Sequence, residues 1–331
     1  MTRRTIPEAS LLAARASRDR MLERARRRGR VRLYRVHTAM ILPLVGLLGL
    51  VPIDAASALG GWLGRWIIRR VAPARYLYKN VRVAFPALSD GEIDAMLAEM
   101  NDNIGRCLAE GVHLGAFAGR DNSRLRLVGL EHLAAAQAGG RGVLFVSGHF
   151  GNWELYEVAL ANLGLDGAKV LQHPSNPFIL EWVAKRRYAF GLGEQIASGE
   201  GVFVRVRAAL KAGRVVQMLA DQRTVKGAKV EFFGVETTTN MVPARVAREA
   251  GAAIVLMSMR RLQGAHFEIT FHPPRFVTMA DDERAIMRWV NAFFEDQLRQ
   301  RPAHWLWGHG RWDDVFLKLP AAPLVTAPDA G

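Results

Sequence analysis

The sequence predicts an α/β protein in which a mainly parallel central sheet is flanked by helices, preceded by a helical, membrane-associating N-terminal region. Two observations lead to this prediction. From Arg124 onward, short apolar runs alternate with helical patterns, which is typical of strand–helix–strand units. Before that point the chain has helical patterns only, and an arginine-rich stretch is followed directly by an uncharged apolar one.

The net charge of +14 is concentrated at the N-terminus. Residues 1–35 contain twelve arginines against three acidic residues, a local charge of +9, which leaves +5 for the remaining residues. Residues 38–53 are uncharged and dominated by Leu, Ile, Val and Met. A basic arm alone would also suit RNA, but one placed directly before an apolar segment fits attraction to an anionic cytoplasmic leaflet. We therefore expect a basic helix over 1–36, a membrane-associating segment over 37–66 and no nucleic-acid partner.

The way in which this segment meets the membrane stays open. The uncharged run is about sixteen residues long, below the roughly 20 that a spanning helix needs. Asp54 interrupts the apolar stretch, and Pro43 and Pro52 would bend it. Three alternatives remain: an in-plane or half-inserted anchor, a true span, and a helix of the protein core. A secretory signal peptide is not expected, because the basic region is too long and no cleavage site follows. All three place the rest of the chain on the cytoplasmic face.

Residues 67–319 are expected to form the α/β domain, which opens with a bridge rich in Arg and Tyr and an acidic helix over 90–117. The predicted strands are 125–128, 143–147, 168–172, 194–197 and 215–219, and the helices between them are 152–163, 177–190 and 202–212. Later elements are a helix over 241–250, strands over 253–259 and 266–272 that could pair antiparallel, and an amphipathic helix over 281–301. Residues 320–331, rich in Ala and Pro, are expected to be disordered.

The segment 142–155 carries the strongest chemical signal. An apolar strand is followed by a glycine-bracketed turn that contains His149, and Glu154 comes five residues later. Asn152 is a good N-cap, which would place Glu154 in the first turn of a helix, where the dipole favours a carboxylate and disfavours an imidazolium. Ligands bind at the carboxyl ends of strands in α/β sheets. The pattern predicts that His149 is a general base whose ring Glu154 orients, although this spacing also arises by chance.

At these residues the chain resembles the lipid A biosynthesis acyltransferases, the lauroyl and myristoyl transferases of Gram-negative outer-membrane lipid assembly. The hallmark of that family is a His-x4-Asp/Glu motif, which His149 and Glu154 match. Other segments resemble the family's remaining blocks in the expected order, from residue 35 to 315: Asn80 with Ala84-Phe85-Pro86, Asn176-Pro177 with Arg186, Arg187 and Gly191, Ala220-Asp221-Gln222, Phe232-Phe233-Gly234 with Thr237-Thr238-Thr239, and Trp305 to Trp312. This ordered series is far more specific than His-x4-Glu alone.

The resemblance implies transfer of a fatty acyl chain from acyl-[acyl carrier protein] to a hydroxyl of a lipid A precursor, at the cytoplasmic face of the inner membrane. The implied reaction needs no metal and no cofactor. The implied partners of the protein are the carrier protein, the precursor and membrane lipid. The oxyanion would be met by backbone N–H groups of residues 148–151 or by an arginine. Besides the catalytic His149 and Glu154, we assign substrate-binding roles to Asn152, His173, Arg187, Asp221 and Gln222.

Two positions depart from the family pattern. His173 precedes Pro174 where many members carry Arg-Pro, and Gly310 replaces a basic residue near the C-terminus. The first could alter how an acceptor phosphate or an oxyanion is held. Alternatives to the assigned roles are that Asp221 is a capping carboxylate and that Arg187 is a solvated helix residue.

Other chemistries find less support. There is no Gly-x-Ser-x-Gly elbow and no His-Glu-x-x-His pair. Cys107, the one cysteine, excludes an intramolecular disulfide and is expected to be a buried apolar residue. A metal held by His149, Glu154 and His173 is a minor alternative. The rival functions are acylation of another glycolipid by the same fold and a non-catalytic membrane lipid carrier.

Overall fold

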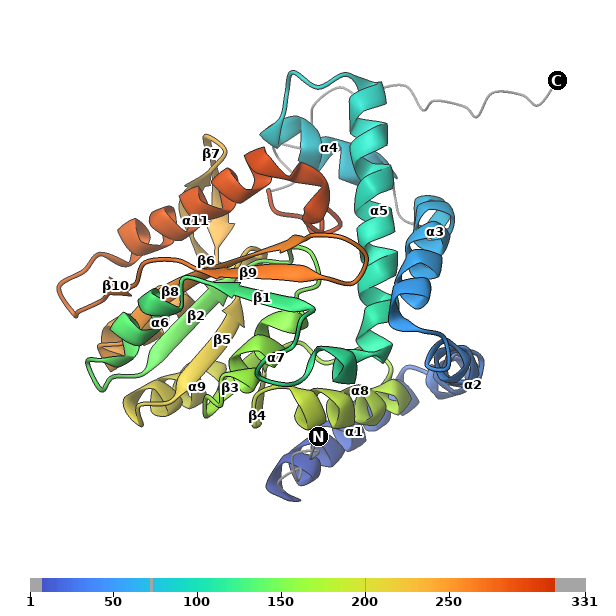
Figure 1. The fold of residues 1–331 in the computed structure, drawn as a ribbon, viewed down its shortest axis with the longest axis horizontal. Helices are drawn as coiled ribbons and strands as arrows, with labels where there is room; N and C mark the ends of the chain where they lie inside the picture. The colour runs from blue at the N-terminus through green and yellow to red at the C-terminus, as the bar shows by residue number, and fades with distance from the viewer. Residues whose placement is uncertain (1–7, 72–73, 200, 313–331) are drawn as a thin grey trace.

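The computed structural model describes residues 8–71, 74–199 and 201–312, and the statements below concern those residues. Helices alone make up the region before the sheet (Figure 1). They are α1 (Glu8–Arg27), α2 (Val31–Leu48), α3 (Ile53–Val71), α4 (Ala74–Ala84), α5 (Asp90–Val112) and the short 3₁₀ helix η1 (Leu114–Phe117). The tail expected to be disordered, residues 320–331, lies outside the described residues.

The apolar segment expected over 37–66 belongs to two helices. α2 ends at Leu48 and α3 begins at Ile53, with Pro52 between them. α2 contains no buried residue, and by length and composition it could cross a membrane. The absence of buried residues in α2 argues against the alternative of a core helix for this part of the chain.

α5 is the longest helix of the described chain, and it lies between α3 and the sheet (Figure 1). It begins with a capping box: the Ser89 hydroxyl accepts the Glu92 N–H, and the Glu92 carboxylate accepts the Ser89 N–H at 2.8 Å. α3 crosses α5 with the two backbones in close contact. A methyl group added at Gly105 would lie 2.0 Å from the carbonyl oxygen of Gly60, so this crossing has no room for a side chain.

The central sheet has eight strands in the order β1-β9-β8-β2-β5-β3-β4, with β10 paired to β8. Antiparallel pairing is confined to β8 with β9 and β10, and the other pairs in this sheet are parallel, which confirms the predicted fold class. The strands are β1 (Leu125–Val128), β2 (Val143–Ser147), β3 (Gly167–Leu171), β4 (Glu194–Ala197), β5 (Val215–Leu219), β8 (Ala253–Arg261), β9 (Phe267–Phe271) and β10 (Arg275–Phe276).

Helices cover both faces of this sheet. They are α6 (Leu130–Gln137), α7 (Leu155–Asn162), α8 (Pro177–Phe190), α9 (Val202–Lys211), α10 (Val242–Ala250) and α11 (Glu283–Gln300), followed by the 3₁₀ helix η2 (Pro302–His304). Side chains of β2 alternate between two apolar clusters: Leu144 and Val146 pack with α9, α10 and α11, whereas Val143 and Phe145 pack with α6 and α7. This alternation is why the whole strand is apolar.

A separate hairpin of β6 (Arg223–Phe232) and β7 (Val235–Thr239) follows β5 and is not among the predicted elements. Phe233 and Gly234 form its turn with φ values of 53° and 71°, the left-handed conformations of a tight two-residue hairpin turn. Phe232, at 0% exposure, and Val230 bury their side chains in the core. The Phe-Phe-Gly block of the sequence is therefore a hairpin turn.

Candidate active site

Two neighbouring parallel strands bring His149 and Asp221 together. Ser147, the last residue of β2, is opposite Leu219, the last residue of β5. The residues two positions beyond each strand therefore leave the same edge of the sheet side by side. Asp221 Oδ1 lies 2.8 Å from His149 Nδ1, and Asp221 Oδ2 accepts the His149 backbone N–H at 2.8 Å. One carboxylate thus holds both the ring and the backbone of His149.

Asp221 stays ionised in spite of its burial. Burial opposes the charge of this carboxyl, but the His149 charge and hydrogen bonds from His149 and from Trp305 Nε1 at 2.6 Å outweigh it and lower the pKa of Asp221 to about 2. An ionised carboxylate only accepts, so Nδ1 of His149 is the protonated nitrogen of the neutral ring. The lone pair is then on Nε2, which is 3.2 Å from the side-chain nitrogen of Gln222.

The C-terminal tryptophan segment packs against the turn that contains His149. Leu306 N–H donates to the His149 carbonyl at 3.2 Å, and Trp305 forms a β-bridge with Phe150. His309 lies with its ring centroid 5.4 Å from that of His149. Burial, followed by the charge of His149, lowers the pKa of His309, so its ring is neutral at pH 7. The neutral side chains of Gln222 and His309 therefore lie beside the His149 ring.

Glu154 does not hold the His149 ring, and the prediction that it orients the ring is wrong. It directly precedes α7, and Arg187 of α8 donates to its two oxygens at 2.8 and 2.6 Å. Lys169 of β3 is 3.2 Å from Glu154 and 2.8 Å from Glu157. Burial opposes the charge of Glu154, but Lys169 and Arg187 outweigh it and hold the pKa of its carboxyl well below the usual range. The orienting carboxylate is Asp221, which comes from a different strand.

The side chain of Asn152 is buried below the turn that contains His149, and Asn152 is not the N-cap of α7. α7 begins only at Leu155, and the Asn152 side chain is fully buried. Its amide donates to Glu110 Oε2 at 2.9 Å, and the thiol of Cys107 donates to its carbonyl oxygen at 3.4 Å. This position suits anchoring of the turn, in place of the predicted contact with substrate. Cys107 is buried, as predicted.

His173 follows β3 in the loop before α8. Burial, and then the charges of Arg187 and Arg20, lower the pKa of His173, and its Nδ1 is buried without a hydrogen-bond partner. The structure thus forms two groups from the predicted residues. His149, Asp221 and Gln222 share one group, and Glu154 and Arg187 form the other, whose charge also acts on His173.

Lys169 is a site-building residue that the sequence reasoning missed, and Asn176 was noted there only as part of a block that resembles the family. Lys169 is 2% exposed in the middle of an apolar strand, and a lysine at such a position is itself a signal of a buried ion pair. Asn176 caps α8 by accepting the Phe178 N–H at 3.0 Å, and its amide donates to the Tyr34 carbonyl and the Thr38 hydroxyl of α2. The membrane-associating helix is thereby tied to the helix that carries Arg187.

The sequence model of the bacterial lipid A biosynthesis acyltransferases matches residues 28–314. The chain belongs to this family. It is similar to the lipid A biosynthesis lauroyltransferase of Escherichia coli K12, with 25% identity over 81% of this chain and 89% of that protein. The lipid A biosynthesis palmitoleoyltransferase of the same organism is 29% identical to this chain, and the match covers 77% of this chain and 83% of that protein. The phosphatidylinositol mannoside acyltransferase of Mycobacterium tuberculosis H37Rv is 26% identical, over 75% and 79%.

Proposed function

We propose that this acyltransferase moves a fatty acyl chain from acyl-[acyl carrier protein] to a hydroxyl of a lipid A precursor, with His149 as the general base. The observation that supports this most is the contact of His149 Nδ1 with Asp221, a carboxylate that remains ionised although it is buried. Such a contact fixes the tautomer with a free lone pair on Nε2 and stabilises the imidazolium that forms when Nε2 takes a proton.

In the proposed reaction the acceptor hydroxyl attacks the thioester carbonyl carbon while Nε2 of His149 takes the hydroxyl proton. The tetrahedral intermediate then expels the thiolate of the carrier, which recovers the proton from Nε2. Gln222 occupies the approach to Nε2 and has to yield to the acceptor hydroxyl. No metal and no covalent enzyme intermediate is needed in this sequence of steps.

The oxyanion donor is better sought among side chains than in the turn itself. The backbone N–H groups of His149, Phe150 and Gly151 already donate to Asp221, Gly148 and His304. Arg187 is held by both oxygens of Glu154. His309, on the open side of the catalytic ring, is a neutral donor within reach of a substrate bound there.

The acceptor could instead be a different glycolipid. Relatives named for lipid A and for phosphatidylinositol mannoside match this chain with similar identities, 25–29% and 26%. Mass spectrometry of lipid A from a strain without this protein distinguishes the two. Loss of one secondary acyl chain supports the lipid A acceptor, whereas intact lipid A with an altered second glycolipid supports the alternative.

We further propose that the protein acts at the cytoplasmic face of the inner membrane. α2 exposes apolar side chains along its whole length, and α3 adds exposed Trp62, Trp66 and Ile67. Indole rings favour the membrane–water interface. The arginines of α1 precede this surface and would meet anionic head groups.

Transfer by a His149→Ala variant tests the mechanism. Loss of a positioned base lowers turnover by roughly 10²–10⁴. A melting curve checks that the variant is folded, because the ring is also the partner of the buried Asp221 carboxylate. The matched control is His132→Ala on α6, which should transfer acyl chains at the wild-type rate. Near-normal activity of His149→Ala would contradict the proposed general base.

A further inference from the structure

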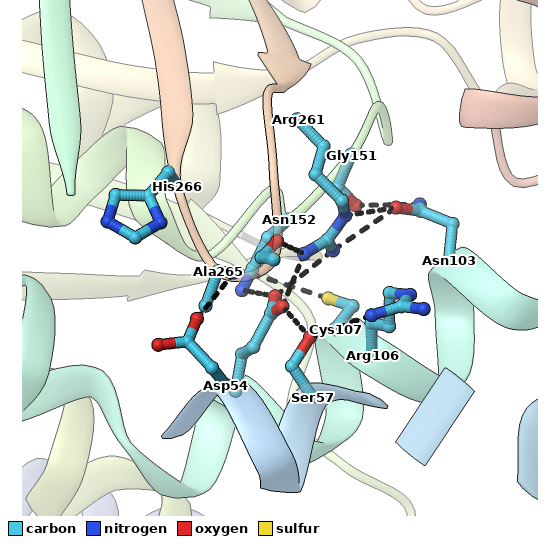
Figure 2. Close-up of polar contacts among 12 residues, drawn as sticks. Asp54, Ser57, Asn103, Arg106, Cys107, Gly151, Asn152, Arg261, Ala265 and His266 are labelled. Carbon is cyan, nitrogen blue, oxygen red and sulfur yellow. Dashed lines mark hydrogen bonds and ion pairs between the residues drawn. The ribbon is translucent and has the colours of Figure 1, made fainter. Parts of the chain in front are cut away.

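Glu110 of α5 is a fully buried carboxylate outside the His149–Asp221 pair. Arg261, at the end of β8, donates to both of its oxygens, with Nη2 at 3.1 Å from Oε2. The hydroxyl of Ser57 on α3 donates to Oε1 at 2.6 Å. Figure 2 shows Ser57, Asn152 and Arg261 pointing toward one another in this region.

This network ends on the catalytic turn. Asn152 lies three residues after His149 in the sequence, and its side-chain amide donates to Glu110 Oε2 at 2.9 Å. Asn103, one helical turn before Cys107, accepts from Arg261 and donates through its amide to the Gly151 carbonyl at 3.2 Å. In Figure 2, Gly151 and Asn152 lie next to the Arg261 guanidinium. Gly151 and Asn152, two consecutive residues of the turn, are therefore both held by side chains of α5.

The other side of the turn is held by different groups. Asp221 accepts the His149 N–H, and the carbonyl of His304 accepts the Gly151 N–H at 2.9 Å. Gly151 itself has a φ of 55°, a left-handed conformation that the chain adopts at low cost only with glycine. The ring of His149 thus depends on two sets of contacts, one from the sheet edge and one from the Glu110 network.

Buried ion pairs contribute little net stability, because removing both charges from water costs about as much as their attraction returns. Their better supported role is to fix one geometry, and a displacement of about 1 Å at a reacting group can cost 10²-fold in rate. We propose that Glu110 is a positioning residue of acyl transfer, which through Asn152 fixes the turn that carries His149. This inference rests on the proposed function, since it assumes that His149 is the reacting group.

Glu110→Gln tests the proposal, with Ser57→Ala as the matched control. Gln keeps the size of the side chain but removes the charge and one of the two acceptor oxygens that Arg261, Ser57 and Asn152 share. Ser57→Ala removes a hydrogen bond to the same carboxylate from the side of α3, away from the turn. We expect Glu110→Gln to lower kcat at least tenfold with KM within twofold, and Ser57→Ala to stay within twofold in both.

A second variant keeps the test valid if Glu110→Gln does not fold. Asn103→Asp still accepts from Arg261 but can no longer donate to the Gly151 carbonyl, and it should lower kcat in the same way. In both variants KM should stay within twofold of the wild-type value, because the change affects the geometry of the reacting ring and not the binding of substrate. Loss of folded protein alone would lower the active fraction and leave the kcat of the folded protein unchanged.

The outcomes separate this inference from the proposed function. A wild-type kcat in folded Glu110→Gln and Asn103→Asp would overturn the positioning role, as would a raised KM with an unchanged kcat. If His149→Ala is active, the proposed function itself fails, whatever Glu110 does. An inactive His149→Ala, together with a lowered kcat and an unchanged KM in the folded Glu110 or Asn103 variant, supports both.

Discussion

Replacing Asp221 with asparagine is the most direct test of the ion pair at the sheet edge. The variant keeps the shape of the side chain and one acceptor oxygen, but it removes the charge that faces His149 at 2.8 Å. An amide nitrogen placed toward Nδ1 would also favour the wrong tautomer of the ring. Both effects act on the protonated state of His149 that forms during transfer.

The magnitude follows from the pKa of Asp221, which is lowered from 3.8 to about 2 although burial acts in the opposite direction. At about 1.4 kcal/mol per pKa unit, this corresponds to roughly 2–3 kcal/mol of net preference for the ionised form. The attraction to His149 and the hydrogen bonds together must exceed that figure, because they also overcome the effect of burial. Only part of this preference comes from the His149 ring, because the His149 backbone and Trp305 also donate to the carboxylate. We therefore expect the loss of the charge to slow transfer by roughly 10- to 10⁴-fold.

The assay is steady-state transfer from acyl-[acyl carrier protein] to a lipid A precursor in detergent micelles. Asp166→Asn is the control, because Asp166 is an exposed carboxylate paired with Arg214, and this variant should be as active as the wild type. If folded Asp221→Asn retained more than a fifth of the wild-type kcat, the carboxylate would not stabilise the reacting ring and the reasoning would be refuted.

Two further predictions concern stability, one concerns membrane association and one concerns activity at His173. Glu154→Ala should destabilise the fold by roughly 3–5 kcal/mol in chemical denaturation, because it leaves the largely buried Arg187 without its carboxylate and Lys169 with Glu157 alone; a loss below 1 kcal/mol would contradict this. Burial, then nearby arginines, lower the pKa of His304 from 6.5 to about 4, so the stability that it contributes is present above pH 6.5 and is lost as the pH falls toward 4. His304→Gln should flatten this dependence by up to about 3 kcal/mol between pH 7 and 4, and an unchanged slope would show that other groups cause it. Stable membrane association should need both helical surfaces: deleting α1 and α2 and replacing Trp62 and Trp66 with Ser should release the protein into the supernatant, and continued pelleting would place the anchor elsewhere. His173→Arg restores the residue common in the family and should keep measurable transfer, so complete inactivity of a folded variant would indicate a role in proton transfer.

The strands and most helices follow from the sequence because their signals are local. The apolar run of β2 and the positions of β3, β5 and α8 can be predicted within a residue or two, since burial on both faces demands continuous apolar residues. The β6–β7 hairpin does not follow in the same way, because its turn has Phe233 in a left-handed conformation that is uncommon for such a residue.

The site was predictable in its residues but not in their pairing. The sequence places His149 and Asp221 each just after an apolar strand, which is sufficient to suggest a functional edge. Their contact depends on β5 being the neighbour of β2, a fact of strand order that no local pattern encodes. Glu154 is nearer in sequence, and proximity along the chain favoured the wrong carboxylate. Glu110 carried no signal, because an acidic residue in an acidic helix is expected to be solvated.

The close crossing of α3 and α5 has a consequence for how the enzyme meets its substrates. Gly60 brings the α3 backbone against Gly105, while Trp62 and Trp66 on the same helix are exposed. A bilayer that accepts those indole rings would therefore also set the tilt of α5, and with it the height of the sheet edge above the lipid head groups. Acceptor hydroxyls that lie at other depths in the membrane would then be excluded because they cannot reach the sheet edge, whatever contacts the side chains of the site could make with them.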